Sequence, residues 1–181
     1  MEKILDYVQG WSELAIVIRL IIATLLGCLI GLERIAKRHN AGIRTFALVS
    51  LGAAASTALN VKLGMLPGLD ADVSRIPAGV ISGIGFLGAG TILVTGRNQI
   101  KGLTTAASLW VCSAMGMVIG AGYLFIGIVC FALIMIANRI LQYLSQSVEE
   151  HSRYISFYLE VEKLKGVVKL RKYIAETGYE L

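Results

Sequence analysis

Long apolar stretches separated by short polar segments are the main pattern of this 181-residue chain. The first stretch runs from Leu14 to Leu32, the second from Thr45 to Val61 and the third from Ile76 to Thr95. A helix rises about 1.5 Å per residue, so stretches of this length match a hydrocarbon core of about 30 Å. The pattern predicts three membrane-spanning helices in this part of the chain.

The segment from Gly102 to Asn138 contains 37 residues without a charge. As one helix it would be about 55 Å long, which is too long for a single crossing. We therefore expect two spans, Leu103–Ile119 and Tyr123–Leu141, joined by a hairpin at residues 120–122. The predicted fold is an all-α polytopic membrane protein with five transmembrane helices in residues 1–141.

The composition changes after Leu141. Residues 142–152 are polar and indicate a linker or helix extension, whereas Tyr154–Glu162 alternates as a strand does. Helical spacing over Leu164–Thr177 and a second strand that begins at Gly178 complete a β-α-β pattern in residues 153–181. A core of about 30 residues is too small to stand alone, so we expect this short cytoplasmic α/β tail to be completed by a partner, by the membrane domain or by further residues.

The composition excludes an ordinary soluble domain, since 56% of residues are hydrophobic, 16% are charged and the mean hydropathy is +0.71. Cys28, Cys112 and Cys130 lie inside apolar segments without C-x-x-C spacing, which argues against disulfides and zinc. The net charge of +5 comes from loops and the tail, so we predict no nucleic-acid partner. Acids near the N-terminus indicate that no signal peptide is cleaved.

The basic residues predict the orientation of the spans. Seven fall on one side and three or four on the other, so the positive-inside rule puts the N-terminus outside and the C-terminus in the cytoplasm. The inner set is Arg34, Lys37, Arg38, Arg44, Arg97, Lys101 and Arg139, and the outer set is Lys3, Lys62, Arg75 and, near the membrane surface, Arg19.

Small residues predict the helix contacts, because close backbone approach is a main source of helix association in lipid. The segment Gly79–Trp110 is the richest in glycine, and we expect the other helices to pack around it. An alternative is that it forms a bent or partly unwound helix whose backbone holds an ion. The candidate packing residues are Gly27, Gly31, Gly79, Gly83, Gly85, Gly88, Gly90, Gly116 and Gly120.

Charged residues near the membrane are the candidates for function. Arg19 either snorkels to the surface or faces the bundle and pairs with an acid, of which Asp70 and Asp72 are the nearest expected. These two acids are either turn residues or ligands of a hard divalent cation such as magnesium. We predict that Asp72 is coupled to Arg19 or to Arg75.

The residues do not suggest an enzyme. Between Asp72 and Glu149 there is no acid, and with two isolated histidines no acid-base pair is available inside the membrane. Gly83–Gly88 matches G-x-G-x-x-G, but no strand precedes it and no acid follows at the required distance. We therefore predict no catalytic residues and no cofactor, with magnesium as the one possible ligand.

Four blocks in fixed order, RLIIATLLGCLIGLER, AGIRTFALVSLGAAAS, DVSRIPAGVISGIGFLGAGTI and KGLTTAASLWVCSAMGMVIGAGY, resemble the MgtC/SapB family of bacterial inner-membrane proteins. The resemblance implies five membrane helices, a cytoplasmic tail, and a link to growth at low magnesium and to virulence. The tail is shorter than the complete ferredoxin-like domain of the best-known member. Matched by position, the characteristic polar residues are Arg19, Glu33, Arg34, Arg44, Thr45, Asp72, Arg75, Thr104 and Thr105.

The resemblance implies a non-enzymatic protein that supports adaptation to low magnesium by regulating another membrane complex such as the ATP synthase. The alternative is a transporter or channel for magnesium or another cation. Five helices are few for a transport pathway, so this alternative requires a homo-oligomer, with a dimer favoured. The expected partners are the lipid bilayer, a second copy of the chain and another inner-membrane complex.

Overall fold

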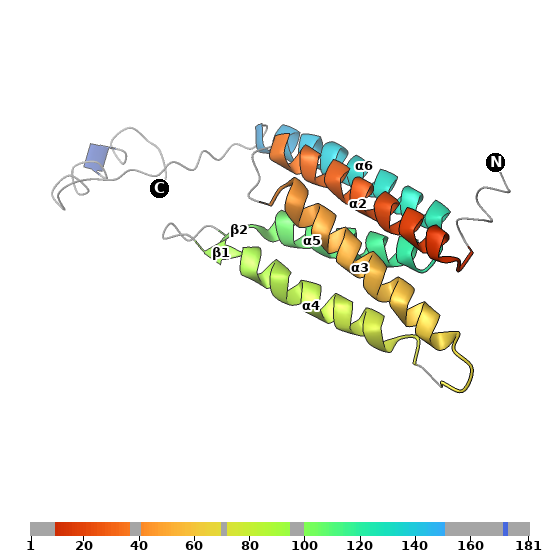
Figure 1. Ribbon diagram of the computed structural model, residues 1–181. Coiled ribbons are helices and arrows are strands. Elements are labelled where there is room, and N and C mark those ends of the chain that lie inside the picture. Colours follow the sequence, from red (N-terminus) through yellow and green to blue (C-terminus); the bar gives the residue numbers. More distant parts are fainter. Residues whose placement is uncertain (1–9, 37–40, 70–71, 95–99, 151–171, 174–181) are drawn as a thin grey trace. The chain divides into compact units, whose positions relative to one another are not determined.

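A computed structural model describes residues 10–36, 41–69, 72–94, 100–150 and 172–173. Its helices are α2 (Glu13–Ala36), α3 (Ile43–Gly64), α4 (Arg75–Thr91), α5 (Leu103–Gly120) and α6 (Leu124–Glu150) (Figure 1). Within the described residues, four helices are long and apolar enough to cross a membrane: α2, α3, α5 and the Leu124–Leu141 part of α6. The prediction of a helical membrane protein is therefore confirmed, while α4 is shorter, with 17 residues.

The third apolar stretch ends earlier than predicted. After α4, the strand β1 (Leu93–Val94) pairs antiparallel with β2 (Ile100–Lys101). Leu93 and Val94 were predicted to belong to the third span, and the hairpin was not predicted, because strands of two residues are too short to show alternation. The hairpin leads directly into α5 through Gly102, whose φ of +97° and close approach to the Thr91 carbonyl exclude a side chain.

The turn between the last two spans lies where the sequence predicts it. The Gly122 amide donates to the Ile119 carbonyl and the Tyr123 amide to the Val118 carbonyl, at 3.0 and 3.1 Å. With Gly122 at φ +98°, these two bonds form a Schellman motif, which satisfies carbonyls at the end of α5. The charge-free segment is therefore two helices, as its length requires.

The centre of the bundle differs from the prediction. Helix α3 packs against α2, α5 and α4, whereas α4 packs against α5 and, less extensively, α3 (Figure 1). The expectation that Gly79–Trp110 organises the bundle is therefore wrong for its first half. The physical reason is that glycine-rich α4 has few side chains to bury, and Ile84 and Gly88 are its buried residues.

Close helix contacts occur where glycines meet a neighbouring backbone. A side chain at Gly27 would lie 2.7 Å from the Phe46 carbonyl, and one at Gly116 would overlap the Ser50 carbonyl. The Ser50 hydroxyl donates to the Ala23 carbonyl at 2.7 Å, which adds a buried hydrogen bond between α3 and α2. Glycine and serine thus let α3 approach α2 on one side and α5 on the other.

The chain divides into two compact units, Met1–Gln142 and Tyr143–Leu181. The first unit holds α2, α3, α4, α5 and most of α6. Of the second unit the structure describes the last turns of α6 and the helical pair Lys172–Tyr173. The predicted strands and most of the predicted helix of residues 153–181 lie outside the described residues.

Candidate functional site: buried charges at both ends of the bundle

A buried ionic cluster joins three helices near the C-terminal end of α2. Arg34 is only 2% exposed, and its Nη2 donates to the Thr105 hydroxyl of α5 at 3.0 Å. Glu33 is 8% exposed and interacts electrostatically with the Arg34 guanidinium. The Asn138 amide of α6 donates to the Glu33 carboxylate at 3.4 Å. We call Glu33, Arg34, Thr105 and Asn138 the Arg34 cluster.

The Arg34 cluster brings together three residues that the family resemblance selects. Adjacent positions on α2 point to different neighbours, so Arg34 reaches α5 while Glu33 reaches α6. The sequence analysis missed Asn138, although an amide inside an apolar span is itself a sign of helix-to-helix bonding. Among the described residues the Arg34 Nε has no hydrogen-bond partner.

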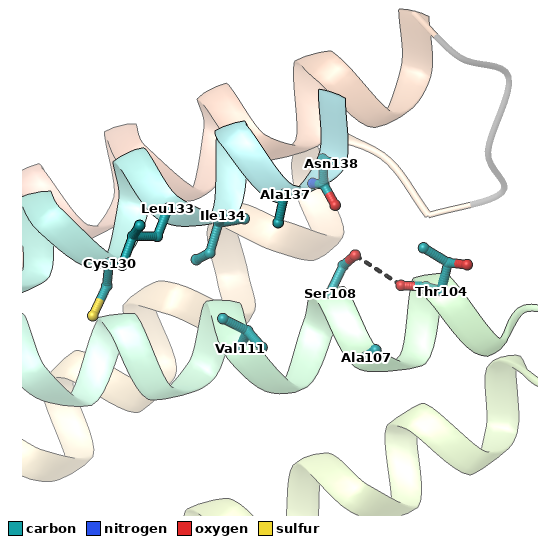
Figure 2. A pocket seen from close by; sticks show the side chains of 9 residues that line it. All are labelled: Thr104, Ala107, Ser108, Val111, Cys130, Leu133, Ile134, Ala137 and Asn138. Atoms are coloured by element: carbon teal, nitrogen blue, oxygen red, sulfur yellow. Dashed lines mark hydrogen bonds between the residues drawn. The ribbon is translucent and has the colours of Figure 1, made fainter. Parts of the chain in front are cut away.

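Beside this cluster, α5 and α6 enclose a pocket of about 400 Å³ (Figure 2). The Ser108 hydroxyl donates to the backbone carbonyl of Thr104 at 2.7 Å, so it is already bonded within α5. Polar side chains stand at one end of the pocket and apolar ones along the rest. Its lining consists of Thr104, Ala107, Ser108, Val111, Cys130, Leu133, Ile134, Ala137 and Asn138.

Arg19 occupies the opposite end of the bundle and is fully buried. Its Nη1 donates to the Gly120 carbonyl at 3.4 Å and its Nη2 to the Gly10 carbonyl at 3.0 Å. The guanidinium also lies over the Trp11 ring, 4.4 Å from its centroid. Gly120 ends α5, where carbonyls lack intrahelical donors and the helix dipole favours a cation. Arg19 therefore caps α5 from α2.

The Arg19 side chain is buried at the end of the bundle, and the partners that the structure shows for it are carbonyl oxygens and an aromatic ring. Asp72 instead lies exposed in the turn before α4, bonded to Ser74. Of the two arginines predicted to couple to Asp72, Arg75 interacts with it electrostatically, and the described partners of Arg19 do not include Asp72. The Asp72 side chain is short, so its carboxylate forms hydrogen bonds with Ser74 in its own turn.

Asp72 behaves as a turn residue. Its carboxylate accepts from the Ser74 hydroxyl at 2.6 Å and from the Ser74 amide at 2.8 Å. These bonds lower the pKa of Asp72, the hydroxyl having the larger effect, and Arg75 lowers it further by its charge. The lowered pKa stabilises the folded turn above the ordinary carboxyl pKa of about 3.9, and this contribution disappears as the pH falls through the folded value.

We expect the Asp72 carboxyl of the purified protein to titrate below its ordinary pKa in NMR spectra. Ser74→Ala should move the midpoint up more than Arg75→Gln does, because the hydrogen bonds outweigh the charge. Arg19→Gln serves as the control and should leave the midpoint unchanged. A change of the Asp72 midpoint in Arg19→Gln would show that Asp72 and Arg19 interact.

The other predicted polar residues are not members of the Arg34 cluster. Arg44 is exposed and Thr45 half-buried at the start of α3, and Arg75 is exposed at the start of α4. Thr104 lines the pocket, while Asp70 lies outside the described residues. In the described part of the chain no three histidine, cysteine or acidic side chains gather as a metal site would require.

The predicted packing glycines fall into two groups. Gly27, Gly31, Gly116 and Gly120 each abut a neighbouring backbone, and Gly88 lies in ordinary contact with Ala106. A side chain added at Gly79, Gly83, Gly85 or Gly90 would meet no atom of the described residues within 4 Å. These four lie on α4 with Phe86, which is 85% exposed. We call Gly79, Ser82, Gly83, Gly85, Phe86, Ala89 and Gly90 the outer face of α4.

Several known proteins are similar to this chain. A 177-residue match at 31% identity covers 94% of this chain and 74% of an uncharacterized protein of Haemophilus influenzae. The putative magnesium transporter YhiD of Escherichia coli is 45% identical over 117 residues, covering 62% of this chain and 54% of YhiD. The protein MgtC of Brucella abortus is 42% identical over 127 residues, covering 70% of this chain and 51% of MgtC.

The chain thus spans about half the length of the YhiD and MgtC proteins that it matches. No solved structure matches it. The model of the MgtC family matches residues 20–147, a range that includes the Arg34 cluster, the outer face of α4 and the pocket between α5 and α6. The chain therefore belongs to the MgtC family.

Proposed function

We propose that this chain supports adaptation to low magnesium by regulating another complex of the bacterial inner membrane, such as the ATP synthase. The observation that carries the proposal is the outer face of α4. Its glycines leave open space on the side away from α5, and Phe86 stands out from it. Small residues facing outward on a membrane helix provide a surface where the backbone of a helix from another protein can approach closely.

The proposal includes five membrane spans. At about 1.5 Å per residue, the 17 residues of α4 extend about 25 Å, and the apolar Ile92 continues the stretch. With five consecutive crossings, the Arg34 cluster lies on the same side of the membrane as Arg44, Lys101 and Arg139. Lys62 and Arg75 then lie on the opposite side. The positive-inside rule then makes the Arg34 end cytoplasmic and the N-terminus external.

The buried charges favour regulation over cation transport. Among the described residues, the charged side chains buried in the bundle are the two guanidinium groups of Arg19 and Arg34 and the carboxylate of Glu33. A divalent cation crossing between these helices would meet a net positive interior, which costs electrostatic energy in a medium of low dielectric constant. The best acidic candidate, Asp72, is exposed and bonded to its own turn.

The second candidate function is transport of magnesium or another cation by a homo-oligomer. It is favoured by the name of the similar E. coli protein, a putative magnesium transporter. A dimer would then supply the polar pathway that one chain lacks. Saturable magnesium uptake by proteoliposomes that contain the purified chain alone would establish this candidate in place of regulation.

The regulatory proposal predicts that Gly83→Leu abolishes the benefit of the chain at low magnesium. A leucine on the outer face holds the partner helix away, and overpacking of about 1–3 kcal/mol weakens association by about 5-fold to 160-fold. The measurement is growth under magnesium limitation of a strain whose growth depends on this chain, with the amount of protein in the membrane determined in parallel.

The matched control is Ala132→Leu, which adds the same side chain at an exposed small residue on α6. This variant should support growth like the wild type. If Gly83→Leu is present in the membrane at the normal level and also supports normal growth, the outer face of α4 is not the contact and the proposal loses its structural basis.

A further inference from the structure

The pocket lies between α5 and α6, which are both candidate membrane spans, so lipid is expected beside it. Its lining residues Val111 and Leu133 are exposed on the surface. The volume of about 400 Å³ falls within the range of about 300–1,000 Å³ of ligand pockets. Its walls are apolar along Val111, Cys130, Leu133 and Ile134 (Figure 2). Such walls favour a hydrocarbon chain.

The other end of the pocket is polar. Thr104 and Asn138 stand there, on facing helices (Figure 2). Thr104 is the second residue of α5, so it lies in the first turn, where amides lack intrahelical acceptors and the helix dipole is positive. Asn138 connects this end to Glu33 and hence to the Arg34 cluster. The pocket is therefore amphipathic, with its polar end at the N-terminus of α5.

The charge around the polar end is positive. Hydrogen bonds join Arg34 to Thr105 and Asn138 to Glu33, so the C-terminal end of α2, the start of α5 and the later part of α6 meet here. A side chain at Gly31 would touch Ile43, which brings the start of α3 to the same end. The charged residues described near these contacts are the acid Glu33 and the bases Arg34, Arg44, Lys101 and Arg139, whereas Glu149 and Glu150 follow ten and eleven residues after Arg139 on α6. Basic groups beside an apolar slot favour an anionic lipid head group.

We propose that the pocket between α5 and α6 binds one acyl chain of an anionic phospholipid, with the phosphate at the Thr104 end. The apolar wall holds the chain, while the first turn of α5 and the basic side chains around it attract the phosphate. The lipid fills space between α5 and α6 next to the Arg34 cluster. This inference is independent of the partner proposed for the outer face of α4.

The test uses the purified full chain in detergent, with phosphatidylglycerol and phosphatidylcholine as probes. Native mass spectrometry should show one phosphatidylglycerol retained per chain under conditions that remove phosphatidylcholine. Ala137→Trp fills the pocket from α6 and should reduce this retention at least tenfold. The control Ala132→Trp puts the same ring on an exposed part of α6 that does not line the pocket, and it should retain the lipid like the wild type.

A second measurement needs no variant. Cys130 lines the pocket, whereas Cys28 on α2 does not, so site-resolved alkylation by N-ethylmaleimide compares the two thiols in one sample. Phosphatidylglycerol should slow modification of Cys130 about tenfold relative to Cys28, and phosphatidylcholine should not.

Three results would overturn the proposal. If both lipids protect Cys130 equally, the pocket does not select an anionic head group. If neither lipid protects Cys130 and no lipid is retained, the pocket does not bind a lipid. Protection of Cys130 that rises with protein concentration in the absence of lipid assigns the pocket to a second copy of the chain.

Discussion

Replacing Gly116 by valine is expected to prevent the helix bundle from assembling. A side chain at this position of α5 would overlap the Ser50 backbone carbonyl of α3, and a backbone group cannot rotate away as a side chain can. Overpacking in a core costs about 1–3 kcal/mol or more, and we expect a value at or above the top of this range. The measurement is denaturant unfolding in micelles, followed by helical circular dichroism.

Gly52→Val is the matched control for this variant. It adds the same side chain to α3, but no heavy atom lies within 4 Å of the position that the new Cβ would take. Its unfolding midpoint should stay close to that of the wild type. If both variants unfold alike, the close approach of α3 and α5 at Gly116 does not stabilise the bundle.

The second large effect is expected at Arg34. Arg34→Met removes the hydrogen bond to Thr105 and leaves the buried Glu33 carboxylate without its neighbouring positive charge. Losing a buried hydrogen bond to a charged group costs about 1.5–3 kcal/mol, and the Glu33 carboxylate also loses a favourable electrostatic interaction. The same unfolding measurement should show a loss of this size, well above the loss for Arg44→Met at an exposed position.

Adding Glu33→Gln to Arg34→Met separates the charge effect from lost packing. The amide keeps the shape of the glutamate without its charge, so the double variant should recover part of the stability lost in Arg34→Met. A double variant whose loss equals the sum of the two single losses would show that the two charges are independent.

The helices could be predicted because the apolar stretches are long and their ends are marked by local signals. The turn at Gly122 shows this well. The charge-free stretch is too long for one crossing, so it needs a turn, and a glycine can adopt the positive φ that such a turn requires. The membrane character, the helix order and the family follow from the same local information. The two-residue strands before α5 carry no such signal.

The neighbours of each helix could not be predicted, because they depend on contacts between residues far apart in the sequence. Arg19 illustrates this, since its partner Gly120 is 101 residues away and accepts through its backbone carbonyl. Every residue has such a carbonyl, so the residue type does not identify this partner. The Arg34 cluster also depends on Asn138, 105 residues from Glu33. Glycine density on α4 was interpreted as a sign of the bundle centre, but glycines with open space beside them mark its outer side.

The most direct test of the proposed function is photo-cross-linking from position 86 in cells grown at low magnesium. A photoreactive phenylalanine analogue replaces Phe86 on the outer face of α4, and the control places the same group at Phe125, an exposed phenylalanine on α6. We expect a cross-link from position 86, and not from 125, to a different inner-membrane protein whose activity changes when Gly83→Leu is present. Cross-links from position 86 only to a second copy of the chain, with magnesium uptake by that assembly in proteoliposomes, would contradict it.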